Sequence, residues 1–259
     1  MTDNIPSTSQ DAASAPRPLS SENEIQSAYT SPKVAEEYIA QRFTNELHRL
    51  LHDRQVAAVQ RVMDQAHPKR ILEIAPGPGR LTRDVRPTGQ LICLEYNEGM
   101  IEQGRSACQG KANWIRGNGF SLPFGPCFDL VYSFRFIRHF HREDRERLYA
   151  QVRRVLVPGG QFVFDAVNER ISKPLREANP AEYPIYDKLY RPDDLRRELS
   201  AAGLEVVTLA PVQKVLRIQS LSQWFIGPRA RWLNRLVIRG LERLSWRDGL
   251  EWIVTCRRA

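Results

Sequence analysis

The sequence is poor in the features that mark secreted, metal-binding and membrane-spanning proteins. Its four cysteines, at positions 93, 108, 127 and 256, form no Cys-x-x-Cys pair and no cluster with histidine. Neither a zinc site nor a disulfide framework is therefore expected, and this cysteine usage fits a reducing cytosol. No stretch approaches about 18 consecutive apolar residues, and the N-terminus lacks the regions of a signal peptide. We expect a cytoplasmic chain that neither spans a membrane nor is secreted.

Acidic residues are scarce near the C-terminus. The chain of 259 residues has a formal net charge of +8, and positions 214–259 hold ten Lys or Arg against Glu242, Asp248 and Glu251. That segment therefore contributes +7, which leaves +1 for everything before it. This asymmetry predicts a local basic face rather than a surface that binds nucleic acid throughout, and no RNA-binding motif is present. Sequence-specific contact with nucleic acid is not expected.

The length suits one α/β domain with appendages. Residues 1–21 are rich in Ser, Thr, Pro and Ala, which is typical of a disordered tail. Residues 22–66 carry a helical pattern from Ser31-Pro32 onward and are expected to form N-terminal helices that act as a lid. Residues 67–259 are expected to form the main domain, with a cover segment at 168–191 and a basic helical insert at 214–249.

The most informative stretch is Arg70–Arg83. Its apolar run, Ile71-Leu72-Glu73-Ile74, is typical of a buried parallel strand and leads directly into Ala75-Pro76-Gly77-Pro78-Gly79. Two glycines before a helix-compatible segment predict a tight turn at which a ligand can approach backbone amides. A glycine-rich turn is weak evidence alone, because a plain connecting turn would look the same.

Three later strands support a nucleoside site. The apolar run 91–95 ends in Glu95, about twenty residues after the loop, which is the spacing at which a carboxylate meets a ribose. The strands predicted at 113–116 and 128–133 follow. The carboxyl ends of parallel strands meet at one edge of the sheet, so the loops after these four strands should surround one crevice. A dinucleotide and S-adenosylmethionine are the two candidate ligands. The dinucleotide fingerprint requires three glycines, whereas this loop has Ala75, Gly77 and Gly79.

The frame around Glu73 resembles the first motif of the class I S-adenosylmethionine-dependent methyltransferases of the small-molecule type. The resemblance extends from about Ala28 to the C-terminus. Three further matches support it: Glu95-Tyr96-Asn97 with Met100, Gly117-Asn118-Gly119-Phe120, and Phe128–Ser133. It implies an α/β fold with a doubly wound, seven-stranded, mostly parallel sheet of the Rossmann-like type, N-terminal helices, and a helical insert before the last, antiparallel strand. It also implies S-adenosyl-L-methionine as cofactor and S-adenosyl-L-homocysteine as product.

The resemblance also implies which residues bind the cofactor. They are Glu73, Ala75, Gly77, Gly79, Glu95, Tyr96, Met100, Gly117, Asn118, Gly119, Phe120 and Ser133, with Tyr38 and Arg42 from the lid. Two positions depart from the family pattern. Ala75 replaces a glycine and fits the turn only if its φ is negative, and Asn118 replaces an aspartate but can still accept a hydrogen bond from adenine through its carbonyl. Alternatively, Tyr38 packs on the domain and Arg42 faces solvent.

Acceptor residues are expected after the fourth strand and in the cover. His139 is the candidate base for a hydroxyl acceptor, and its alternative is to cap or pack beneath the next helix. Arg135 and Arg138 would bind an anionic acceptor or face water. Tyr186 and Tyr190 would contact the acceptor, or pack the cover onto the domain.

The insert carries an arginine every four residues, at 231, 235, 239 and 243, beside an apolar stripe that includes Trp232, Leu233 and Leu236. Three roles are open for residues 229–246: contact with an anionic membrane, a lid over the acceptor pocket, or a homodimer face.

These observations leave three functions. The first is methyl transfer to a small molecule, with O-transfer ahead of N- or C-transfer. The second is methyl transfer to a lipid or isoprenoid at a membrane surface. The third is a non-catalytic protein that binds a nucleoside or RNA.

Overall fold

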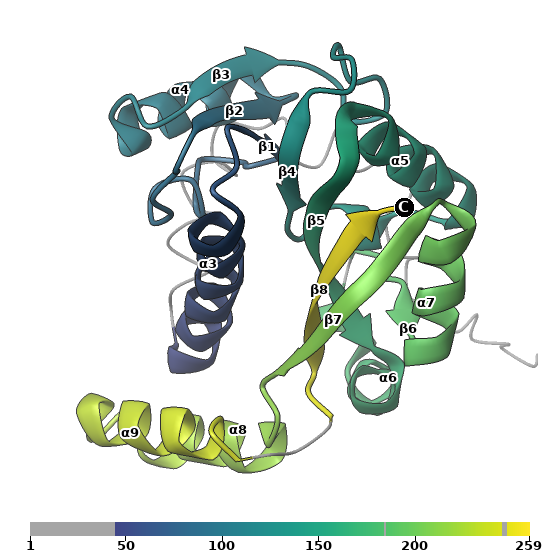
Figure 1. Ribbon diagram of the computed structural model, residues 1–259. Coiled ribbons are helices and arrows are strands. Elements are labelled where there is room, and N and C mark those ends of the chain that lie inside the picture. The colour runs from purple at the N-terminus through teal and green to yellow at the C-terminus, as the bar shows by residue number, and fades with distance from the viewer. Residues whose placement is uncertain (1–44, 184, 245–247) are drawn as a thin grey trace, which may run out of the picture.

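The computed structural model describes residues 45–183, 185–244 and 248–259. It contains a sheet whose strand order is β3-β2-β1-β4-β5-β8-β7, with the short strand β6 paired to β5 (Figure 1). The strands are β1 (Arg70–Ile74), β2 (Gln90–Glu95), β3 (Asn113–Arg116), β4 (Phe128–Ser133), β5 (Leu156–Asn168), β6 (Leu189–Tyr190), β7 (Leu204–Val212) and β8 (Glu251–Arg258). Among the described strands, β8 runs antiparallel to both of its neighbours, β5 and β7, and all other pairings are parallel. The predicted doubly wound, mostly parallel sheet is confirmed, with β6 as an addition.

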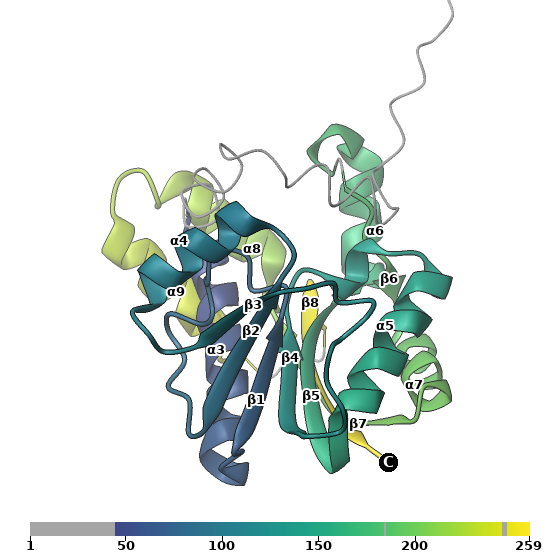
Figure 2. The same cartoon turned by 90° about the horizontal axis from the view of Figure 1, so that it is seen from above.

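Helices cover both faces of this sheet (Figures 1 and 2). They are α3 (Glu46–Ala66), α4 (Glu98–Cys108), α5 (Arg142–Val155), α6 (Glu169–Ala178), α7 (Pro192–Ala201), α8 (Leu216–Phe225) and α9 (Arg231–Leu241). Val59 of α3 and Ile101 of α4 belong to one buried cluster, whereas Leu148 of α5 and Leu195 of α7 belong to another. The central strands are therefore buried on both sides, which explains their continuous apolar runs.

The junction between α5 and β5 differs from the prediction. We expected Pro158-Gly159-Gly160 to end the helix and a strand to begin at Gln161. Instead α5 ends at Val155 and β5 runs from Leu156 to Asn168. Leu156 is already extended and pairs with Phe128, and a register shift between Phe128 and Leu130 accommodates the proline and the glycines. The strand therefore continues through residues that usually break regular structure.

The basic insert is a pair of helices, α8 and α9, rather than one helix from Arg229 to Trp246. It leaves the sheet after β7 and projects away from it (Figure 1). Both β5 and β7 are antiparallel to β8, so β7 ends at the edge where β1, β2, β4 and β5 also end. The insert therefore begins on the ligand side of the sheet. The predicted disordered tail at 1–21 and the lid residues Tyr38 and Arg42 lie outside the described residues.

Candidate cofactor and acceptor site

A cavity opens where the first four strands end, as the motifs predict. It encloses about 1030 Å³ of space between atoms, counted with its open mouth. Of the predicted site residues, it is lined by Glu73, Ala75, Gly77, Glu95, Tyr96, Met100, Gly117, Asn118, Gly119, Phe120, Arg135 and His139. The loops after β1, β2, β3 and β4 therefore converge on one site.

The turn after β1 is tighter than the sequence suggested. Ala75 has a φ of 53°, so the expectation of a negative φ at this residue is wrong. Its N–H donates to the Leu94 carbonyl over 2.9 Å, which holds the strained residue against β2. Gly77 and Gly79 also have positive φ values. Gly77 lines the cavity, whereas Gly79 does not. A Cβ at Gly79 would lie 2.6 Å from Cys108 Sγ, so this glycine permits close packing of the turn on α4.

Glu95 is fixed at the end of β2 by backbone amides. Its Oε1 accepts from Tyr96 N at 2.8 Å and Asn97 N at 2.9 Å, and its Oε2 accepts from Gly77 N at 3.0 Å. Burial raises the pKa of this carboxyl, and the three amide hydrogen bonds oppose that shift. An ionised carboxylate can accept about four hydrogen bonds, so Glu95 retains capacity for a ribose hydroxyl.

Glu73 lines the cavity, but its hydrogen bonds are made to residues that lie behind the cavity wall. Its Oε2 accepts from Thr82 Oγ1 at 2.6 Å and from Tyr132 OH at 2.8 Å. Burial raises the pKa of Glu73 to about 7, although these hydrogen bonds oppose the shift. Ser133 does not reach the cavity, because its hydroxyl donates to the Ile74 carbonyl and ties β4 to β1. We therefore assign Ser133 to the frame of the site.

The predicted adenine side is formed by Met100 and the loop after β3. Met100 is buried, and its N–H donates to Asn97 Oδ1, which caps α4. The Asn118 carbonyl that we expected to accept from adenine accepts from Phe120 N at 2.9 Å. It therefore shapes its own loop. An amide oxygen carries two lone pairs, so this hydrogen bond does not prevent a second one.

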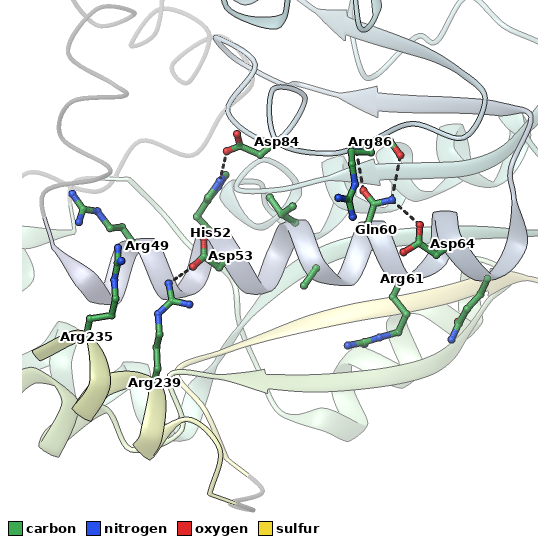
Figure 3. Close-up of a pocket in the computed structure, with 13 residues that line it drawn as sticks. Arg49, His52, Asp53, Gln60, Arg61, Asp64, Asp84, Arg86, Arg235 and Arg239 are labelled. Carbon is green, nitrogen blue, oxygen red and sulfur yellow. Dashed lines mark hydrogen bonds and ion pairs between the residues drawn. The ribbon is translucent and has the colours of Figure 1, made fainter. Parts of the chain in front are cut away.

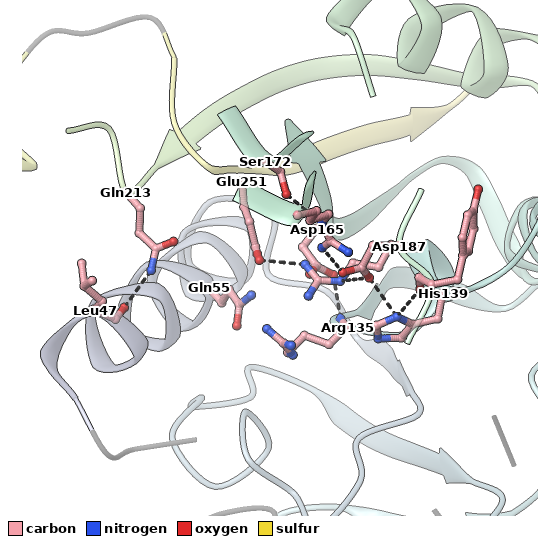
Figure 4. Close-up of polar contacts among 12 residues, drawn as sticks. Leu47, Gln55, Arg135, His139, Asp165, Ser172, Asp187, Gln213 and Glu251 are labelled. Atoms are coloured by element: carbon pink, nitrogen blue, oxygen red, sulfur yellow. Dashed lines mark hydrogen bonds and ion pairs between the residues drawn. The ribbon is translucent and has the colours of Figure 1, made fainter. Parts of the chain in front are cut away.

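His139 lies in the opposite wall, beside aromatic rings. The Phe136 and Phe140 ring centroids are 5.1 Å apart, and both rings line the cavity together with Phe134 and Phe120. His139 Nδ1 lies 2.8 Å from Asp187 Oδ1 and 3.0 Å from the Tyr186 carbonyl oxygen (Figure 4). Both neighbours accept protons, so this geometry assigns the proton to Nδ1 and leaves Nε2 as an acceptor.

Asp187 belongs to this wall of the site although it was not predicted to do so. Burial raises its pKa, but the charge of Arg138 and the hydrogen bond from His139 outweigh this and hold the pKa of the carboxyl well below its usual range. Asp187 therefore stays ionised beside the imidazole. No motif marks it, because it meets His139 from a cover segment 48 residues further along the chain.

Arg138 is neither an anion site nor solvated, contrary to both alternatives. It is buried, and its guanidinium lies 2.9 Å from Asp165 Oδ2, 2.8 Å from Glu251 Oε1 and 3.0 Å from Asp187 Oδ1. Arg138 therefore joins β5, β8 and the cover behind the cavity. Arg135, by contrast, lines the cavity, and its backbone N–H donates to Asp165 Oδ1 over 2.6 Å.

The two predicted acceptor tyrosines lie outside the cavity. Tyr190 is buried and its hydroxyl donates to Glu198 Oε1 over 2.7 Å, so it packs the cover onto α7. The ring of Tyr186 lies 4.4 Å from that of His141, and its contribution to the site is the carbonyl next to His139. The packing alternative therefore describes both side chains.

Arg80 is a cavity residue that motif matching missed. Its Nη1 lies 2.8 Å from His52 Nδ1, and its Nη2 donates to Gln55 Oε1 over 2.7 Å. His52 Nε2 lies 2.7 Å from Asp84, while burial and the charge of Arg80 lower the histidine's pKa. These contacts fasten α3 to the cavity wall.

A second opening runs along the outer side of α3 (Figure 3). Two acidic residues of this opening are paired within it, Asp53 with Arg239 and Asp84 with His52, and Gln60 donates to Asp64. None of the motif residues lines it. We therefore assign it no role in the chemistry.

Within 45–183, 185–244 and 248–259, no group of three or more His, Cys, Asp or Glu is arranged to hold a metal ion. No helix in the same ranges has the length and hydropathy needed to cross a bilayer. All four cysteines are free.

Comparison with known proteins agrees with this geometry. Residues 71–160 match the family described as "Methyltransferase domain". The ubiquinone/menaquinone biosynthesis C-methyltransferase UbiE of Pseudomonas fluorescens (strain Pf0-1) is 29% identical over 136 residues, which cover 48% of this chain and 50% of that protein. UbiE of Stutzerimonas stutzeri (strain A1501) is 32% identical over 131 residues, covering 46% and 48%. The match thus spans about half the length of these relatives.

Solved structures show the same fold. Magnesium protoporphyrin IX methyltransferase (ChlM) from Synechocystis PCC 6803, with bound SAH, aligns over 92% of this chain and 100% of its own, with a TM-score of 0.65 and 10% identity. The [4+2]-cyclase SpnF aligns over 93% and 98%, with a TM-score of 0.62 and 16% identity. The matched domain, the strand order and the carboxylate at the end of β2 agree with one another: residues 71–160 match a methyltransferase domain, and the chain has the fold of the class I S-adenosylmethionine-dependent methyltransferases.

Proposed function

We propose that this protein transfers the methyl group of S-adenosylmethionine to a small molecule that carries an acidic hydroxyl on an aromatic or enolic skeleton. The observation that supports this most is the pairing of His139 with Asp187 in a cavity wall made of phenylalanine rings. Such rings suit a flat apolar acceptor, and a neutral imidazole beside them can take a proton from a hydroxyl.

The residues on the cofactor side fit the adenosyl group. Glu95 would bind the ribose, Met100 and the loop at 117–120 would border the adenine, and the turn at 75–77 would allow close approach of the methionine part. When bound, the sulfonium supplies an activated methyl carbon. Transfer is an in-line displacement, so the protein's main contribution is alignment of donor and acceptor.

His139 has a defined proton path in this proposal. Nε2 accepts the acceptor's hydroxyl proton, the new imidazolium is stabilised by ionised Asp187, and the oxygen forms its bond to the methyl carbon as the carbon–sulfur bond breaks. S-adenosylhomocysteine leaves, and the proton then passes from His139 to solvent. Arg135, in the same wall, would orient an acceptor that carries an anionic substituent.

A second candidate is C-transfer. The curated relatives are named as C-methyltransferases of ubiquinone and menaquinone biosynthesis. Deprotonation of a phenol by the same histidine also makes the ring carbon nucleophilic, so the site supports both outcomes. NMR of the product distinguishes them: an O-methyl signal supports the first proposal, and a ring methyl supports the second.

The test is turnover of labelled S-adenosylmethionine with a panel of phenols and hydroxyquinones. His139→Ala should lower kcat by about 100-fold or more while calorimetry shows unchanged affinity for S-adenosylhomocysteine. Asp187→Asn should also lower kcat, because it removes the carboxylate that stabilises the new imidazolium. His141→Ala is the matched control, because His141 is exposed and does not line the cavity. An unchanged rate in His139→Ala would return this residue to a structural role. Binding without turnover across the panel would favour a non-catalytic nucleoside-binding protein.

A further inference from the structure

The α8–α9 pair, defined here as residues 214–244, is built with its polar side chains inward. The residues of α8 that are buried are Gln219 and Ser222, and those of α9 are Asn234 and Ile238. Ser222 Oγ donates to Asn234 Oδ1 over 2.8 Å, and Gln219 Nε2 donates to Glu242 Oε2 over 3.1 Å. A helix on a water-soluble surface usually shows the opposite arrangement, with its apolar stripe turned to the core.

The apolar side chains of the pair point outward instead. Ten large hydrophobic side chains are exposed among the described residues, and eight belong to this pair: Ile218, Leu221, Trp224, Phe225, Trp232, Leu233, Leu236 and Leu244. Trp224 is 73% exposed and Trp232 is 68% exposed. Such a concentration of exposed apolar side chains on one helix pair marks a contact with another apolar phase or partner. It also shows that the stripe of α9 is not packed on the domain as a lid.

Basic residues surround this surface. The pair holds seven Lys or Arg and one acidic residue, Glu242, which is buried. Arg235 and Arg239 are paired with Glu46 and Asp53 of α3. Arg217, Arg231 and Arg243 are exposed and have no carboxylate partner within the described part of the chain. The exposed surface of the pair is therefore strongly positive as well as apolar.

The charge decides between the two occupants that such a surface could have. In a two-fold homodimer the same patch faces itself, so these arginines would meet one another with no acidic residue of the patch to offset them. An anionic bilayer offers phosphate groups to the arginines and an apolar layer to the rings and leucines, and tryptophan favours the interface between them.

We propose that the α8–α9 pair docks this protein on the surface of an anionic phospholipid membrane. Trp224, Trp232 and Leu236 enter the headgroup region, and the exposed arginines bind lipid phosphates. The pair is held on α3, since Glu46 N donates to Gln223 Oε1 and Arg235 and Arg239 pair with Glu46 and Asp53. The docked surface is thus rigidly connected to the cavity wall that Arg80 and α3 share.

The position of the pair in the fold connects membrane docking with the cavity. It begins at the sheet edge where the cavity opens, so a docked protein would present that edge towards the membrane. An acceptor dissolved in the bilayer could then reach the cavity without crossing water. The docking itself does not depend on the proposed methyl transfer, and it is measured without turnover.

The test is co-sedimentation of the full chain with phosphatidylcholine vesicles, with and without phosphatidylglycerol. Binding should require phosphatidylglycerol and should fall steeply in high salt. The double variant Arg231→Gln/Arg243→Gln should bind about 25-fold more weakly, at about fivefold for each arginine. The double variant Trp224→Ser/Trp232→Ser should lose at least about tenfold. Each variant is first shown to keep its melting temperature and its affinity for S-adenosylhomocysteine.

Two matched controls lie elsewhere on the surface. Arg142→Gln/Arg197→Gln removes the same charge from exposed positions on α5 and α7, and Val207→Thr replaces an exposed apolar residue on β7. Both should bind vesicles as the original chain does. Equal binding to neutral and anionic vesicles, no binding at low salt, or equal losses in controls and variants would overturn the proposal. Light scattering that shows a dimer dissolved by the tryptophan variant, without vesicle binding, would assign the surface to a second copy instead.

Discussion

The cofactor side and the acceptor side of the cavity are held by contacts of very different reach along the chain. Glu95 is fixed by amides of Tyr96, Asn97 and Gly77, all within 18 residues. On the other side Arg138 meets Glu251, 113 residues away, and His139 meets Asp187 and Tyr186 of the cover. The first side is therefore a property of local sequence, and the second exists only once distant segments are packed together.

The two sides also differ in how they handle buried charge. On the acceptor side, Arg138 lies among three carboxylates, whose charges raise its pKa even though burial lowers it. On the cofactor side, Glu73 has neutral hydroxyl donors, and burial raises its pKa to about 7. Removing one charge should therefore destabilise the first side and stabilise the second.

The largest effect is expected from Arg138→Met. It leaves Asp165, Asp187 and Glu251 buried without their shared cation, which should cost about 3 to 5 kcal/mol of the free energy of unfolding. Urea denaturation measures the loss. Arg142→Met is the control, because that arginine is exposed and should leave the midpoint unchanged. A loss in Arg138→Met no larger than that of the control would show that the cluster is not a structural unit.

Glu73→Gln should instead raise the free energy of unfolding. With a pKa near 7 in the folded protein against 4.5, Glu73 keeps a proton between about pH 4.5 and 7 that the unfolded chain has lost. Its contribution to stability therefore falls as the pH rises through that window. Glutamine cannot ionise but can still accept from Thr82 and Tyr132, so the variant should gain relative to the original chain by up to about 3 kcal/mol at pH 8.

Thermal unfolding of both proteins at a series of pH values measures this difference. The advantage of Glu73→Gln should be small at pH 5 and should grow until the pH passes 7. A constant difference across the series would mean that Glu73 does not titrate in this range in the folded state.

Glu95→Ala should weaken cofactor binding on the cofactor side. It removes the carboxylate from the end of β2 and frees the amides of Tyr96, Asn97 and Gly77, so affinity for S-adenosylhomocysteine should fall by about 30-fold. Calorimetry measures it, with Glu98→Ala as an exposed control on the next helix. Unchanged affinity would remove Glu95 from the cofactor site.

The smallest effect concerns the strained turn. Ala75→Gly removes a Cβ from a residue with a φ of 53°, which should stabilise the fold by about 0.5 to 1 kcal/mol after the entropy cost of glycine. Urea denaturation would detect this shift. Destabilisation would show that the alanine methyl makes packing contacts, against the cluster beside it, that outweigh the strain.

The cofactor side could be predicted from sequence because its requirements are local. A glycine turn follows a strand, a carboxylate ends the next strand, and parallel pairing brings their ends together. Ala75 shows the limit of that reasoning: the residue type suggested a negative φ, but pairing with Leu94 on β2 imposes a positive one.

The acceptor side could not be predicted in the same way. Asp187 carries no pattern, since its role depends on what faces it across the fold. Arg80, next to the glycine turn on the cofactor side, is unmarked for the same reason, because its partners lie on α3. Tyr190 and Arg138 looked suited to substrate contact by residue type, yet Glu198 and three buried carboxylates bind them instead. In the insert, periodicity correctly indicated helix, but the break at Gly227-Pro228 and the inward turn of the polar residues required the structure.

The place of β8 in the sheet sets the order in which a nascent chain can complete the site. This strand is the last of the described strands along the sequence, yet it lies between β5 and β7 and carries Glu251. While translation is still upstream of β8, β7 and the helices after it have no neighbour in the sheet, and Arg138 lacks one of its carboxylates. The nucleoside pocket can therefore assemble during translation, whereas the wall that holds His139 is finished only after the final strand has left the ribosome.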